Sequence, residues 1–106
     1  MALSLEDAQF LEQMVLQLEE TIAELVVRER QISDSLGEER VSELAALWHK
    51  QLDHDEELEL RRTMDWTDRE LIWIWARLQR ARSARAEAGK AIMTRFDATG
   101  DAPDDS

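Results

Sequence analysis

The chain contains no cysteine and no tyrosine, one proline and three glycines among its 106 residues. Without cysteine, disulfide bonds, thiolate zinc sites and cysteine nucleophiles are excluded. So few turn-forming residues also argue against a sandwich or barrel of many short strands. The sequence has no run of eighteen apolar residues either, so we expect no transmembrane helix. Because the first residues lack the basic and apolar regions of a secretory signal, we expect a cytoplasmic protein.

The formal net charge of −11 is unevenly distributed along the chain. Residues 1–60 contain sixteen acidic and four basic side chains, whereas residues 61–95 contain four acidic and nine basic ones. Residues 96–106 add four aspartates. An acidic first half repels phosphate groups, so we expect no direct binding of nucleic acid. The basic stretch either forms an anion-binding face or packs against the acidic helices of the same chain, and we favour the second arrangement.

Apolar residues recur in steps of three and four over most of the chain, which is the period of an amphipathic helix or a coiled coil. The first such segment predicts a helix over residues 5–34, with Glu29 as one polar residue in its apolar seam. A broad apolar stripe without a breaker residue predicts a second helix over 38–63. A third periodic segment, whose apolar seam begins with Leu71, Ile74 and Leu78, predicts a helix over 68–96. The remaining residues, 97–106, are acidic and aperiodic, so we expect them to form a disordered tail.

The start of the third predicted helix carries the strongest local signal. Thr67 and Glu70 have the spacing of a capping box, in which each side chain accepts a hydrogen bond from the other residue's amide. Trp66 precedes this cap and Leu71 occupies the fourth helical position, which is the arrangement of a hydrophobic staple. This pattern predicts that the helix begins immediately after Thr67.

Three helices with short connections predict an all-α protein, most simply an antiparallel three-helix bundle that forms a single domain over residues 1–96. The alternative is a long helical hairpin in which two of the segments fuse, and two copies then pair as a four-helix dimer. In either arrangement Glu29 needs a partner or water. It either pairs with Arg85, at the equivalent seam position of the third helix, or reaches solvent.

Large apolar side chains lie outside the core stripe of the third predicted helix. Trp75 falls beside core positions, whereas Trp73 points about 120° away from the seam and Ile72 also lies off the stripe. Tryptophan and arginine together are typical of binding hot spots. The expected partner-binding residues are Trp66, Arg69, Ile72, Trp73, Arg77 and Arg80. The alternative interpretation is that the third helix is central and buries these side chains within the same chain.

One cluster of histidines and carboxylates resembles a metal site. Its weak candidate ligands are His49, Asp53, His54 and Glu57. On one helix His49 and Asp53 would share a face, but di-iron bundles place a glutamate three residues before each histidine. Those two positions hold Ala46 and Gln51. Since a His-Glu-x-x-His motif and a glycine-containing calcium loop are also missing, we expect a solvated helix face and no metal or other cofactor.

No catalytic pattern emerges from the sequence. It has no Gly-x-Ser-x-Gly motif and no glycine-rich phosphate loop, and a small bundle has little room for a preorganised pocket, so we do not expect an enzyme. The favoured hypothesis is a protein-interaction module, such as an adaptor, a regulatory subunit or a small acidic chaperone. It would bind a protein partner or a second copy of itself, with a homodimer as the simplest version. The alternatives are an acidic mimic that occupies a partner's nucleic-acid-binding surface and, less favoured, a metal-binding bundle of carboxylates and histidines.

Overall fold

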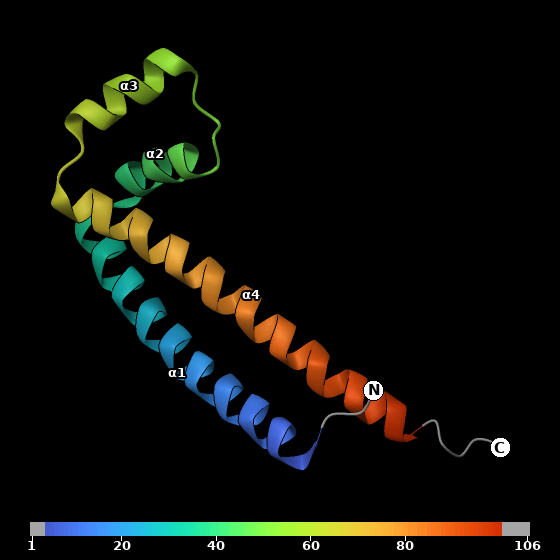
Figure 1. Ribbon diagram of the computed structural model, residues 1–106. Helices are drawn as coiled ribbons and strands as arrows, with labels where there is room; N and C mark the ends of the chain where they lie inside the picture. Colours follow the sequence, from blue (N-terminus) through green and yellow to red (C-terminus); the bar gives the residue numbers. More distant parts are fainter. Residues whose placement is uncertain (1–3, 101–106) are drawn as a thin grey trace. The chain divides into compact units, whose positions relative to one another are not determined.

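The computed structural model describes the backbone of residues 4–100 and the side chains of residues 4–94. Four helices, and no strand, occupy this part of the chain (Figure 1). They are α1 (Leu5–Leu36), α2 (Glu38–Trp48), α3 (His54–Thr63) and α4 (Trp66–Gly100). The predicted all-α class is therefore confirmed, although the number of helices is four rather than three. None of these helices has the length and the apolar character that crossing a bilayer requires.

The single helix predicted over residues 38–63 is wrong, because these residues form two helices with a break between them. Beyond the end of α2, Lys50 has a φ of 56°, a left-handed conformation that interrupts a helix. A complete capping box then begins α3. The Asp53 carboxylate accepts a hydrogen bond from the Glu56 amide at 2.8 Å, and the Glu56 carboxylate accepts one from the Asp53 amide at 3.0 Å. This new helix start replaces the continuous helix that the apolar pattern predicted.

The start of α4 also differs from the prediction, since the capping residues lie two positions earlier. The Asp68 amide donates to the Asp65 carboxylate at 3.0 Å, and the Asp65 amide donates to the Asp68 carboxylate at 3.1 Å. The capping box predicted for Thr67 and Glu70 is therefore wrong. The predicted hydrophobic staple is wrong as well, because Trp66 is already helical and 82% exposed.

The far ends of the two long helices lie a few residues beyond their predicted positions. α1 continues to Leu36, where the positive φ of Gly37 (92°) turns the chain out of the helix. α4 continues to Gly100 rather than ending near residue 96. The rest of the predicted acidic tail, residues 101–106, lies outside the described residues.

The described chain divides into two compact units. Unit 1 combines α1 up to Ala23 with α4 from Gln79 onward. These two helix segments run in opposite directions (Figure 1). Among the described side chains of this unit, the buried ones are small: Ala8, Ala81 and Ala88. In this unit Arg85 donates to the Glu19 carboxylate at 2.7 Å. The predicted pairing of Arg85 with Glu29 is therefore wrong.

Unit 2 comprises residues 24–78, which include the end of α1, both short helices and the start of α4. Its buried apolar residues come from all four helices: Ile32, Leu44, Leu47, Leu60, Leu71, Ile74 and Leu78. The core positions predicted for the first part of α4 are confirmed by this set. Along the edge of the core, the half-buried Glu29 accepts a hydrogen bond from the indole nitrogen of Trp75. The hydrogen-bond partner of Glu29 is therefore an indole, which is neither of the two predicted alternatives, Arg85 and solvent.

Candidate protein-interaction surface

The start of α4 is fixed by an ion pair whose carboxylate is almost completely buried. Asp68 is only 2% exposed, and its carboxylate accepts two hydrogen bonds from the guanidinium of Arg40 on α2. The distances are 3.2 Å from Nε to Oδ1 and 2.6 Å from Nη2 to Oδ2. Arg40 also donates to the carbonyl and hydroxyl oxygens of Thr63, the last residue of α3, at 3.2 and 3.4 Å. One guanidinium therefore joins α2, the end of α3 and the start of α4.

The ion pair favours the charged form of both partners. The hydrogen bonds from Arg40 lower the pKa of Asp68, and they outweigh the opposing effect of its burial. The bond to Asp68 in turn raises the pKa of Arg40 above its usual range. Both groups therefore remain ionised at neutral pH, which is the state that their bidentate geometry requires.

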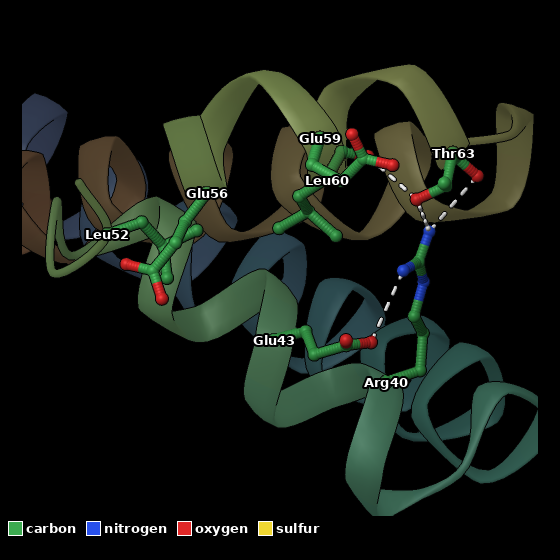
Figure 2. Close-up of a pocket in the computed structure, with 7 residues that line it drawn as sticks. All are labelled: Arg40, Glu43, Leu52, Glu56, Glu59, Leu60 and Thr63. Atoms are coloured by element: carbon green, nitrogen blue, oxygen red, sulfur yellow. Dashed lines mark hydrogen bonds and ion pairs between the residues drawn. The ribbon is translucent and has the colours of Figure 1, made fainter. Parts of the chain in front are cut away.

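A hollow of about 490 Å³ lies beside this ion pair, between α2 and α3 (Figure 2). Its apolar part is formed by Leu52 and Leu60, and its carboxylates are those of Glu43, Glu56 and Glu59. Figure 2 shows Arg40 reaching across one end of the hollow toward Thr63, with a second bond to Glu43 at 3.3 Å. Because this guanidinium already binds three residues, we assign it a structural role rather than a ligand-binding one.

Four of the six predicted partner-binding residues lie on one side of α4. At 100° per residue, Trp66, Arg69, Trp73 and Arg77 fall within an arc of about 80°. The completely buried Leu71 lies about 160° from Trp73, so this arc faces away from the core of unit 2. We call these four residues the α4 stripe.

The α4 stripe exposes two indoles. Trp66 is 82% exposed and Trp73 is 55% exposed. The guanidinium carbon of Arg77 lies 4.6 Å from the centre of the Trp73 ring, which is the geometry of a cation–π contact. The stripe therefore combines large apolar surface with positive charge.

The structure places the other two predicted residues elsewhere. Ile72 lies about 100° from Trp73 around the helix, is half-buried and lines a groove in unit 2. Arg80 is exposed but belongs to unit 1. The six residues predicted as one face are therefore four residues of a stripe, of which Arg69 also lines the groove, one further groove residue and one residue of the other unit.

The groove that contains Ile72 has a volume of about 610 Å³ and lies between the end of α2, α3 and the start of α4. Its apolar lining is Leu47, Trp48, Leu52, Met64 and Ile72. Its charged lining is Lys50, Glu57, Arg61 and Arg69. We call it the α2–α4 groove. The predicted continuous helix over 38–63 could not fold back to form this groove. The spacing of Asp53 and Glu56, which is that of a capping box, was the available sequence signal for the break.

The weak candidate metal ligands are not brought together. His49 is the C-cap of α2, Asp53 is the N-cap of α3 and His54 is its first residue. Glu57 accepts a hydrogen bond from Arg61 at 3.0 Å. The prediction that His49 and Asp53 share a helix face is wrong, because α2 ends at its C-cap, His49, and a new helix begins after Asp53. Throughout the described residues, no three side chains of the metal-binding types are grouped to hold an ion.

Comparisons with known proteins do not assign this surface. Neither a protein-family model, nor a curated protein, nor a solved structure matches the chain. Its chemistry therefore has to be judged from the side chains themselves, which are exposed indoles beside arginines and an apolar groove with a charged rim.

Proposed function

We propose that this protein is a non-enzymatic interaction module that binds another protein through the α4 stripe. The observation that carries this proposal is the exposure of Trp66 and Trp73 on one side of a helix whose opposite side is already buried. A tryptophan side chain presents about 150–250 Å² when it is fully exposed, so covering the 82% of Trp66 and the 55% of Trp73 that are exposed removes about 120–205 and 80–140 Å² from water. These areas correspond to roughly 3–5 and 2–3.5 kcal/mol at about 25 cal/mol per Å². A partner that covers both rings gains this free energy, minus the cost of association.

The arginines of the α4 stripe suit the same role. Tryptophan and arginine are the residue types most enriched in binding hot spots, and Arg77 already lies against the Trp73 ring. In this proposal the indoles are the apolar anchors, while Arg69 and Arg77 orient the partner and raise the encounter rate. An adaptor, a regulatory subunit or a small acidic chaperone works in this way. The bound protein is another chain or a second copy of this one.

The test compares full-length wild-type protein with Trp66→Ala/Trp73→Ala. A matched control, Val27→Ala/Leu58→Ala, removes apolar side chains of unit 2 that are 58% and 47% exposed but lie outside the stripe. Each protein is immobilised, the retained proteins are identified by mass spectrometry, and the mass of the purified complex is measured.

We expect the wild type and the control to retain a stoichiometric partner. The double tryptophan variant should retain at least about tenfold less of it, and circular dichroism should show unchanged helical content. Equal retention by the tryptophan variant would contradict the proposal. A wild-type protein that binds nothing and remains monomeric would contradict it too.

A further inference from the structure

The α2–α4 groove offers a second surface with its own chemistry. Its lining includes the half-buried Trp48, Met64 and Ile72, which lie at the end of α2, at the end of α3 and near the start of α4. These side chains form an apolar surface between helices rather than a flat patch. A groove of this kind is the usual site for the apolar side of an amphipathic helix.

The groove also carries a surplus of positive charge in a chain whose net charge is −11. Glu57 is paired with Arg61 at 3.0 Å, which leaves Lys50 and Arg69 as the surplus cations. Neither of these two has an ion pair to another residue within the described part of the chain. An occupant with complementary chemistry therefore has apolar anchors and carboxylates.

The first turns of α1, in unit 1, have this complementary chemistry. Leu5, Phe10 and Leu16 are 65%, 64% and 57% exposed, although they belong to a long helix that has a buried side. Glu6 and Glu12 lie beside Phe10 and Leu16 along a shallow hollow of the helix surface. We call these five residues the α1 acidic face; they span an arc of about 160° around α1, so a groove must enclose almost half of the helix to contact all of them. It has exposed apolar side chains next to carboxylates, and the groove has an apolar floor next to cations.

We propose that the α2–α4 groove of one copy of this protein binds the α1 acidic face of a second copy. Both halves of the contact are present in every chain, and they differ from each other, so the contact is heterologous. If each of two copies places its α1 acidic face in the groove of the other, the two form a closed dimer. If each copy binds a different neighbour, the copies form an open chain. The proposal adds an assembly surface to the α4 stripe and does not depend on the stripe's partner.

The net charge of the chain decides how this proposal is tested. Two chains of −11 repel each other at long range, so self-association requires local attraction that overcomes this repulsion. Salt screens the attraction and the repulsion together, which makes ionic strength a poor discriminator. Reversing charges on one side of the contact, and then on both, separates the two effects.

The experiment uses the full-length chain in sedimentation velocity. One variant, Lys50→Glu/Arg69→Glu, reverses the groove, and another, Glu6→Lys/Glu12→Lys, reverses the α1 acidic face. We expect the wild type to associate and each variant alone to associate at least about tenfold more weakly. An equimolar mixture of the two should recover association to within about threefold of the wild type, because every groove then meets a face of opposite charge.

The control variant, Arg30→Glu/Arg62→Glu, changes the net charge as much as the groove reversal but alters exposed residues outside the groove. It should associate more strongly than the groove variant, and circular dichroism should show the same helical content for all proteins. Because Arg69 belongs to both the groove and the α4 stripe, Trp66→Ala/Trp73→Ala is measured beside these variants, and self-association through the groove should persist in it.

Three results would overturn the proposal. The first is a wild-type protein that stays monomeric at high concentration. The second is a mixture that fails to recover although each variant is folded. The third is self-association that ignores these charge reversals but is lost in Trp66→Ala/Trp73→Ala. This last result would assign self-association to the α4 stripe, so that failure of the groove proposal and failure of the proposed function give different outcomes.

Discussion

Removing the charge of Asp68 is expected to weaken unit 2 more than any exposed charge substitution. In Asp68→Asn the side chain keeps its shape, but Arg40 loses a carboxylate that it binds at 2.6 and 3.2 Å. Breaking a buried ion pair by removing one partner costs about 3–5 kcal/mol. The Asp68 side chain is 3% exposed and that of Arg40 is 22% exposed, so water compensates part of the loss. We therefore expect the free energy of unfolding to fall by about 3 kcal/mol, the lower end of this range.

The assay is urea denaturation followed by far-UV circular dichroism. Glu43→Gln is the matched control, because Glu43 also binds Arg40 but is 52% exposed; its loss should stay below about 1 kcal/mol. The double variant Arg40→Met/Asp68→Leu should regain part of the stability, since it leaves no unpaired buried charge. If Asp68→Asn and Glu43→Gln were equally destabilising, the reasoning from burial would be refuted.

Two further predictions follow from the helix starts. Because the pKa of Asp68 is lower in the folded state than its ordinary value of 3.8, its ionised form contributes stability that is present above that value and is lost as the pH falls through the folded pKa. Denaturation at a series of acidic pH values should therefore show a steeper loss for the wild type than for Asp68→Asn, and parallel curves would contradict this. Separately, Asp53→Ala removes the capping box of α3 and should cost about 1 kcal/mol. Amide hydrogen exchange should quicken at the Glu56 amide, and unchanged protection there would count against the role of the cap.

The sequence predicts the long helices well because their apolar period is sustained over many turns. The core positions Leu71, Ile74 and Leu78 follow from that period alone, and all three are at most 3% exposed. The helix break after α2 was missed for a local reason. An apolar stripe can continue through a break, whereas the capping pair Asp53 and Glu56 gives the backbone a competing set of hydrogen bonds.

The candidate surfaces differ in how far sequence can predict them. The exposure of Trp73 follows from its angle to the core stripe on a single helix, so periodicity is enough. The α2–α4 groove depends on how three helices pack, and that packing involves contacts between residues far apart in the chain. The bond from Arg40 to Asp68 spans 28 residues, and neither side chain signals its partner in a sequence with many arginines and aspartates.

The Arg40–Asp68 ion pair also determines which side chains the start of α4 presents. A one-residue shift in register turns every side chain of a helix by about 100°, so neither Arg69 nor Trp73 would keep its present direction. The Asp65 cap and the bidentate bond from Arg40 both fix Asp68, the residue immediately before Arg69. A buried ion pair adds little net stability compared with a well-packed apolar pair, but its directional bonds accept one register only. The same contact that is costly to break therefore sets both the charged rim of the groove and the outward direction of the indoles.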